Sequence, residues 1–151
     1  MSDGKTAWIT NSKAQSTPWG EETRWSGGSG GSLVKTLVLA KGKRTSFKYN
    51  KVKDEMLICG TGKVKAYYAD EELITLDAGD LRTGVLEPGS ALIVQPGCPY
   101  RLEALEDSTI LEVSAGHSGD ASRVRLHDDF GRPVAQCTKY MQKVINKWFQ
   151  N

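Results

Sequence analysis

Short apolar segments recur along the middle of the chain, separated by polar turns that contain glycine or proline. This spacing, one segment in about 8 to 12 residues, is typical of an all-β protein. The predicted strands cover 33–40, 44–50, 55–59, 63–69, 73–77, 91–95, 100–106 and 108–115. Residues 78–87 are interpreted as a short connection or an insertion. Such a set of strands favours a jelly-roll or a similar closed sheet, because closure removes exposed strand edges.

Two of these segments predict which side chains point inward. Residues 91–95 are continuously apolar, which indicates a strand buried on both faces. Residues 44–50 instead alternate between two faces. Lys48 and Asn50 share one face, while Thr45, Phe47 and Tyr49 share the other.

The ends of the chain have different patterns. Residues 1–32 are polar, with three tryptophans as apolar anchors. Within them, 26–32 is a glycine and serine run. We interpret that run as a long hairpin loop between two strands of one domain, with an engineered joint as the alternative. Residues 123–132 predict one more short strand and a turn.

After Pro133, apolar residues recur at steps of three and four, which predicts an amphipathic helix beginning beside the proline. We expect it to pack on its own barrel; a dimer contact and a helix lying at a membrane surface are the alternatives. The whole chain is predicted to be one domain. Its parts are an N-terminal extension over 1–32, a barrel over 33–128 and a C-terminal helix within 129–151.

Composition excludes several classes of function. The net charge is only +2 and the basic residues are spread along the chain, unlike those of a nucleic-acid binder. No apolar run approaches the roughly 18 residues that a membrane span needs, and the first residues lack a secretory pattern. The three cysteines are far apart in the sequence, which favours reduced thiols and a cytoplasmic location.

The segment from Gly42 to Gly62 has a glycine, a glutamate and a glycine at a distinctive spacing, with Glu55 at its centre. It resembles the first motif of the cupin superfamily, small β-barrels that carry a metal on inward-pointing side chains. In that motif two histidines precede the glutamate. Here Lys48 and Asn50 occupy the histidine positions.

The segment 89–104 is similar to the second cupin motif. Gly89 and Gly97 fit it, while Gln95 takes the place of a proline and Tyr100 that of the last histidine. The lead-in PWGEETRW, residues 18–25, resembles that of cupins related to mannose-6-phosphate isomerase. This resemblance implies an N-terminal strand laid against the barrel, and a sugar or sugar phosphate as ligand.

The resemblance therefore implies an all-β, cupin-type jelly-roll barrel with an N-terminal strand extension and a C-terminal α-helix. It does not imply a metal here, and we expect no cofactor. Of the four ligand positions only Glu55 keeps a charged ligand, since a protonated lysine has no lone pair to offer. His117 and His127 lie outside both motifs.

The replacements suggest their own arrangement. A lone carboxylate inside a barrel is costly, so we expect Lys48 to form an ion pair with Glu55, with Asn50 and Tyr100 completing the hydrogen bonds. This quartet is predicted to line a pocket for a small polar, carbohydrate-like ligand. Two arginines that flank the motif strands, Arg44 and Arg101, would grip a phosphate or carboxylate at its mouth, or else be solvated.

Two other functions stay open. A sugar-phosphate isomerase or epimerase would use Glu55 as base, Lys48 to polarise a carbonyl and Tyr100 as acid. A non-catalytic interaction protein would use the surfaces of the barrel and helix and need no pocket. By analogy with cupins we also expect a homodimer.

Overall fold

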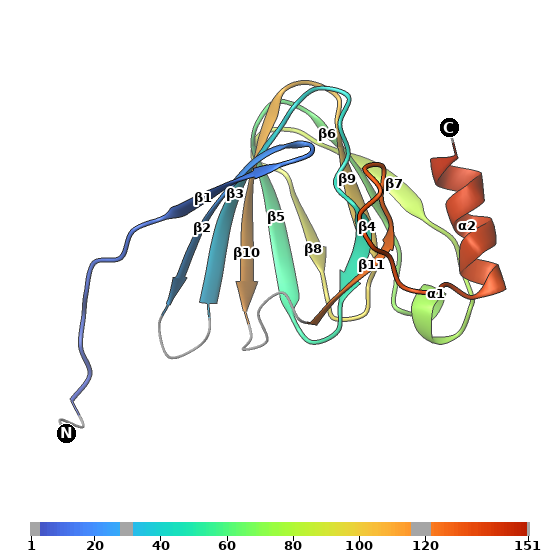
Figure 1. The fold of residues 1–151 in the computed structure, drawn as a ribbon, viewed down its shortest axis with the longest axis horizontal. Coiled ribbons are helices and arrows are strands. Elements are labelled where there is room, and N and C mark those ends of the chain that lie inside the picture. Colours follow the sequence, from blue (N-terminus) through green and yellow to red (C-terminus); the bar gives the residue numbers. More distant parts are fainter. Residues whose placement is uncertain (1–3, 28–31, 116–121, 151) are drawn as a thin grey trace.

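The structure is a computed structural model that describes residues 4–27, 32–115 and 122–150. Two antiparallel sheets face each other around an apolar core, and one helix lies against the outer face of the second sheet (Figure 1). The all-β jelly-roll architecture expected from the sequence is confirmed. Neither of the helices among these residues is long and apolar enough to cross a membrane.

The first sheet contains six strands, and every neighbouring pair in it is antiparallel. Their order is β1 (Lys13–Thr17), β2 (Gly20–Gly27), β3 (Ser32–Leu39), β10 (Ser108–Ala115), β5 (Asp54–Thr61) and β8 (Ala91–Val94). The predicted N-terminal strand is thus a hairpin, β1 with β2, added to the edge of the sheet. Gly27 pairs with Ser32, so the glycine and serine run joins two strands of one hairpin, as interpreted.

The second sheet contains five strands in the order β11 (Arg123–His127), β4 (Phe47–Asn50), β9 (Tyr100–Ala104), β6 (Val64–Tyr68) and β7 (Arg82–Leu86). The turn that leads into β6 requires Gly62. Its φ is +85°, and a Cβ there would lie 2.5 Å from the carbonyl oxygen of Asp107. A side chain is therefore excluded at this turn, which explains the last glycine of the first motif.

The core lies between the sheets and follows the period of two along each strand. Leu39, Leu57, Leu102 and Ile110 are each 0% exposed and come from four strands of the two sheets. Fourteen buried residues form this inner cluster, with Trp19 of the N-terminal hairpin among them.

A second cluster covers the outer face of the five-stranded sheet. Helix α2 (Lys139–Phe149) packs there, with Met141, Ile145 and Phe149 buried against residues that include Phe47 of β4. This confirms that the helix packs on its own barrel. The helix begins later than predicted, because the Thr138 hydroxyl caps it by accepting from the backbone N–H of Met141.

Two predictions between β6 and β7 are wrong. The predicted strand over 73–77 is the short helix α1 (Glu72–Thr75), and the predicted connection over 78–87 contains β7. The chain must reverse here so that β7 pairs with β6, and Asp77 and Gly79 take left-handed φ values of +48° and +81°. A short apolar run fits a helical turn as well as a strand.

The predicted burial of 91–95 on both faces is also wrong. β8 is the last strand of the six-stranded sheet, and only its inward residues Leu92 and Val94 are buried. Ile93 points outward and is 63% exposed. An apolar run therefore marks a strand here, but its outer face has no covering layer.

Candidate functional site

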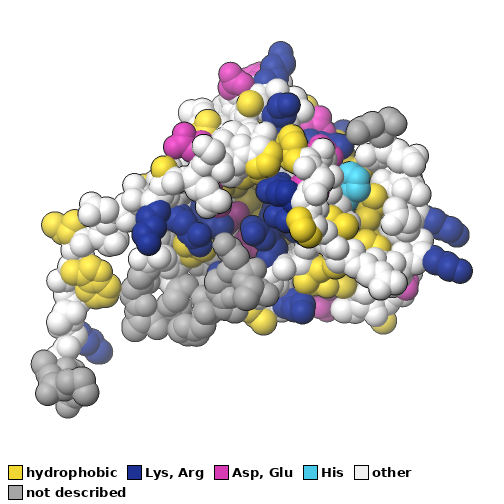
Figure 2. Space-filling view, in the orientation of Figure 1, with side chains coloured by type: hydrophobic (Ala, Val, Ile, Leu, Met, Phe, Trp, Pro, Cys, Tyr) yellow, Lys and Arg dark blue, Asp and Glu magenta, His cyan; other side chains and the backbone are white. Residues whose placement is uncertain are grey.

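A cavity of about 260 Å³ lies between the two sheets, beside the N-terminal hairpin. The space-filling view shows a hollow in which lysine and arginine side chains gather (Figure 2). Five basic residues and two carboxylates line it: Lys35, Lys48, Arg123, Arg125, Arg132, Glu22 and Glu112. Trp19 and Leu37 supply part of its apolar wall. The cavity is therefore mainly basic.

A smaller space of about 20 Å³ shares part of this lining and extends toward Glu55. It adds Asn50, Lys53 and Glu55, while Lys48 and Arg123 border both spaces. A volume of this size holds about one water molecule. Lys48, Asn50 and Glu55, three of the four residues predicted to line a pocket, thus border this small space, and Tyr100 is not among its lining residues. The larger cavity was not predicted from the sequence.

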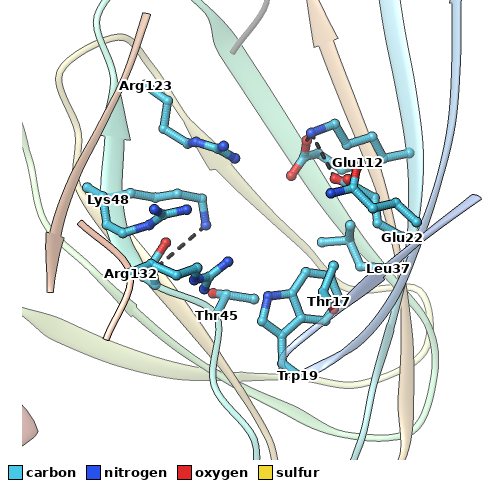
Figure 3. A pocket seen from close by; sticks show the side chains of 13 residues that line it. Thr17, Trp19, Glu22, Leu37, Thr45, Lys48, Glu112, Arg123 and Arg132 are labelled. Atoms are coloured by element: carbon cyan, nitrogen blue, oxygen red, sulfur yellow. Dashed lines mark hydrogen bonds and ion pairs between the residues drawn. The ribbon is translucent and has the colours of Figure 1, made fainter. Parts of the chain in front are cut away.

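On the six-stranded sheet, the basic residue of the cavity lining is paired with carboxylates. Lys35 of β3 lies 2.9 Å from a Glu22 carboxylate oxygen and 3.9 Å from one of Glu112. Glu22 and Glu112 lie on the same side of the cavity (Figure 3). Burial raises the pKa of Glu112, and the nearby charge of Glu55 raises it further. All three side chains are on inward positions of β2, β3 and β10, so this ion cluster forms one side of the cavity.

Lys48 points into the cavity from the opposite sheet (Figure 3). Its Nζ donates a long hydrogen bond of 3.5 Å to the Ser46 carbonyl and lies 4.8 Å from the centre of the Tyr100 ring. Burial lowers the pKa of Lys48 to about 8, although Glu112 and Glu55 favour the charged form. This lysine is therefore held in a less charged state than an exposed one.

The predicted ion pair between Lys48 and Glu55 is wrong. Among the described residues Lys48 forms no salt bridge, and Glu55 instead accepts a hydrogen bond of 2.9 Å from the Tyr100 hydroxyl. Burial raises the pKa of Tyr100 well above its ordinary value, and the charge of Glu55 adds to this effect. The phenol rather than the ammonium thus satisfies the carboxylate.

Asn50 is occupied by the turn after β4. Its Oδ1 accepts from the backbone N–H groups of Val52 and Lys53, at 3.0 and 2.9 Å, and from the Ser122 hydroxyl at 2.9 Å. Such a side chain mimics the backbone of a turn. Its oxygen therefore holds this turn, and a ligand would have to displace a donor to reach it.

Arg44 and Arg101 do not line the cavity, contrary to the prediction. Arg101 alternates with the inward-pointing Tyr100 of β9, so it faces α2, where it is 0% exposed. It donates to Asp129 at 3.0 Å and to the Thr45 carbonyl at 2.7 Å, and Arg44 donates twice to Asp129 at 2.6 and 2.7 Å. His127 also belongs to this outer cluster, within 3.1 Å of Arg101, whereas His117 lies outside the described residues.

Two buried polar atoms of the cavity lining have no hydrogen-bond partner among the described residues. They are Oγ1 of Thr17 and Nε of Arg125. Buried polar groups are rarely left unpaired, because losing water without a replacement costs about 1 to 3 kcal/mol. Both atoms therefore mark the part of the lining on β1 and β11 as incompletely hydrogen-bonded among the described residues.

The residues at the family's metal positions do not fit a transition metal. Lys48 and Asn50 stand where histidines would, the Asn50 oxygen already accepts three hydrogen bonds, and Glu55 accepts from Tyr100. Within the described ranges, no three His, Cys, Asp or Glu side chains gather as a metal site requires.

The sequence prediction missed most of the cavity lining. Lys35 lies between the inward-pointing Leu33 and Leu37 of β3, and Glu112 follows the inward Ile110 of β10. A charge at an apolar position of an alternating strand is a signal that could have found both. In β11 the inward Arg123 and Arg125 alternate with apolar residues that face α2.

No family model and no curated protein matches the sequence. Among solved structures, the capsular polysaccharide assembling protein CapF of Staphylococcus aureus superposes over 80% of this chain, with 10% identity and a TM-score of 0.63. Oxalate decarboxylase from Bacillus subtilis covers 80% as well, with 15% identity and a TM-score of 0.64.

KdgF from Halomonas sp. is similar in size as well as in fold. It covers 74% of this chain, and this chain covers 92% of it, with 15% identity and a TM-score of 0.54. By contrast, this chain spans only 35% of CapF and 33% of oxalate decarboxylase. Identities this low show the fold and not the activity. These three neighbours are cupin-fold proteins, and the chain has the fold of the cupin superfamily.

Proposed function

We propose that this protein binds a small anionic organic molecule in the barrel cavity without a metal. One observation carries the proposal, the excess of basic side chains around the two spaces, which share four lining residues. Six basic side chains line them, Lys35, Lys48, Lys53, Arg123, Arg125 and Arg132, against three carboxylates, Glu22, Glu55 and Glu112. Arg132 is also paired with Asp128 at 2.7 Å, which leaves an excess of two basic side chains. Buried charges need partners, and an anion would supply them.

The arginines that neighbour the open part of the cavity are suited to such a ligand. Arg123 forms no salt bridge with the described residues, and the Nε of Arg125 lacks a partner. A guanidinium binds carboxylate or phosphate through paired hydrogen bonds. Lys35 is already neutralised by its glutamates. The ligand's charge would therefore lie toward β11.

The structural neighbours agree with this chemistry. An oxalate decarboxylase of Lactobacillus farciminis was solved as a formate complex, and CapF was solved with a tropolone inhibitor. Trp19 adds an apolar wall on which a sugar ring would stack. We therefore favour a carbohydrate acid or sugar phosphate over a neutral sugar.

The test is a thermal-shift and calorimetric comparison of matched ligands. Mannose 6-phosphate and glucuronate should raise the melting temperature, whereas mannose should not. Arg123→Gln should weaken binding at least about tenfold, since a hydrogen bond to a charged group is worth about 1.5 to 3 kcal/mol. Arg82→Gln is the matched control, because Arg82 is exposed on β7 and pairs with Asp70 outside the cavity.

Equal binding of mannose and its phosphate would contradict the anionic ligand. Binding of anions that is insensitive to Arg123→Gln would place the site elsewhere. If no small molecule binds, the remaining expectation is an interaction protein that uses its surfaces.

Isomerase or epimerase activity is a second candidate, because Lys48 and Glu55 border the same inner space. Turnover of a sugar phosphate that Glu55→Gln and Lys48→Met both abolish, with binding retained, would support it.

A further inference from the structure

The amine of Lys48 is free to react in a way that the amine of Lys35 is not. Lys35 is held by Glu22 and Glu112, whereas the Nζ of Lys48 has only the 3.5 Å hydrogen bond to Ser46 and the Tyr100 ring. Its side chain ends in the open cavity, opposite the glutamates (Figure 3). A reactant in the cavity would therefore meet this nitrogen directly.

The surroundings also favour the neutral, nucleophilic form of the amine. Burial is the main cause of its low pKa of about 8, and the charges of Arg123 and Lys35 lower it further. At pH 7 about a tenth of such amines carry a lone pair, far more than for an exposed lysine.

We propose that Lys48 condenses reversibly with the carbonyl group of a small anionic aldehyde or 2-oxo acid held in the cavity. This rests on the proposed anion site, because the basic residues of β11 would hold the reactant's carboxylate or phosphate beside the amine.

The step balances without an oxidant or a reductant. The lone pair of Nζ attacks the carbonyl carbon and forms a carbinolamine. The oxygen then leaves as water, taking up the two hydrogens that the amine loses, and a C=N bond joins Lys48 to the ligand. Glu112, whose pKa burial raises, lines the same cavity and supplies a proton to the departing oxygen.

The protonated C=N group withdraws electrons from the adjacent carbon. The C–H group on that carbon would therefore become more acidic, as it does when a Lewis-acid metal binds a carbonyl oxygen. Glu55 borders the inner space next to Lys48 and is the carboxylate placed to accept that hydrogen. Proton transfer next to a carbonyl is the class of reaction that this arrangement serves.

The experiment is reductive trapping at pH 7. The full protein is treated with glyoxylate and cyanoborohydride, and the rate at which each lysine gains a carboxymethyl group is followed by peptide mass spectrometry. Lys48 should be labelled at least about tenfold faster than exposed lysines such as Lys51, given its larger neutral fraction. Lys48→Arg should remove that fast phase, while Lys51→Arg should leave it unchanged.

Two comparisons separate this proposal from the anion site. Acetaldehyde has the carbonyl but no charge, so its preference for Lys48 over Lys51 should be much smaller than that of glyoxylate. Mannose 6-phosphate has the charge and should slow the labelling of Lys48. If mannose 6-phosphate stabilises the protein but Lys48 is labelled no faster than Lys51, the condensation is wrong and the proposed anion site is still supported. If glyoxylate and acetaldehyde show the same preference for Lys48 over Lys51, and neither mannose 6-phosphate nor glucuronate stabilises the protein, both the condensation and the anion site are wrong.

Discussion

Tyr100 donates a hydrogen bond of 2.9 Å to the carboxylate of Glu55, and this pair joins the two cupin-like motifs inside the barrel. The two residues come from β9 and β5, in different sheets. They stand at the positions of a histidine and a glutamate in the family pattern. A hydrogen bond therefore connects the sheets where that pattern would place a metal.

We expect Tyr100→Phe to destabilise the protein by about 1 to 3 kcal/mol, because it leaves the Glu55 carboxylate without its donor. The ring beneath Lys48 is kept, so the loss reports the hydroxyl alone. Urea unfolding measures the change. Tyr49→Phe is the control, since Tyr49 packs on the outer cluster and makes no hydroxyl hydrogen bond with the described residues. Equal effects of the two substitutions would show that the Tyr100–Glu55 bond contributes nothing.

Lys48 makes stability depend on pH. Its pKa is about 8 in the folded protein and about 10.4 when unfolded, so the unfolded chain binds more protons between these values. Stability attributable to Lys48 therefore rises with pH through this window. The groups that set this pKa besides burial are Glu112, Glu55, Arg123 and Lys35.

The measurement compares the wild type with Lys48→Met across pH 7 to 10. At pH 7 the methionine variant should be the more stable by up to about 3 kcal/mol, and its advantage should shrink above pH 8. Taking the difference cancels the opposing effect of Tyr100, whose raised pKa lowers stability at high pH. An advantage that is constant with pH would contradict the low pKa of Lys48.

Asp129 connects the outer face of the five-stranded sheet to the segment before α2. Burial alone would raise its pKa, but the hydrogen bond from Arg44 and the charge of Arg101 lower it overall. Asp129→Asn should cost about 3 kcal/mol, because it leaves the buried Arg101 without its counter-charge. Asp70→Asn removes an exposed pair with Arg82 and should change little.

The same pair of variants separates this outer cluster from the cavity. Urea unfolding should detect the loss in Asp129→Asn, and anion affinity should stay unchanged. Lower affinity in Asp129→Asn would mean that the outer cluster positions the site. The contribution of Asp129 should also be lost in acid, as the pH falls through its lowered pKa.

An apolar row crosses the outer face of the six-stranded sheet. Trp25, Val34, Val113, Met56 and Ile93 are successive cross-strand partners on β2, β3, β10, β5 and β8. Met56 and Ile93 are 39% and 63% exposed. This row is the face on which we expect the homodimer to form.

Met56→Lys should convert such a dimer to monomer without unfolding it, as measured by sedimentation equilibrium. Val85→Lys, on the exposed face of β7 in the other sheet, should leave the mass unchanged. A wild-type protein that is monomeric at high concentration would end the homodimer hypothesis.

The fold was predictable because local signals agree with it. Turn residues such as Gly62 and alternating strands specify where each strand begins and which face is inward. The helix α1 was not predictable, since its apolar residues fit either periodicity. The exposed face of β8 depends on its being an edge strand, and strand order is a property of the whole fold.

The site was predictable only in part. The motif spacing identified Lys48 and Glu55 as neighbours of one inner space, but the choice of partner for Glu55 depends on side-chain positions across two sheets. Side chains alternate between the two faces of β9, so Arg101 must point away from Tyr100. Applying this rule would have excluded Arg101 from the cavity. The same rule applied to β3 would have included Lys35.

The turn built on Asn50 restricts which side chains this position can hold. Three donors depend on its side-chain oxygen, so Asn50→His would remove their common acceptor and disrupt the turn. A residue that lines the inner space is thus constrained by the backbone around it as well as by whatever the space contains.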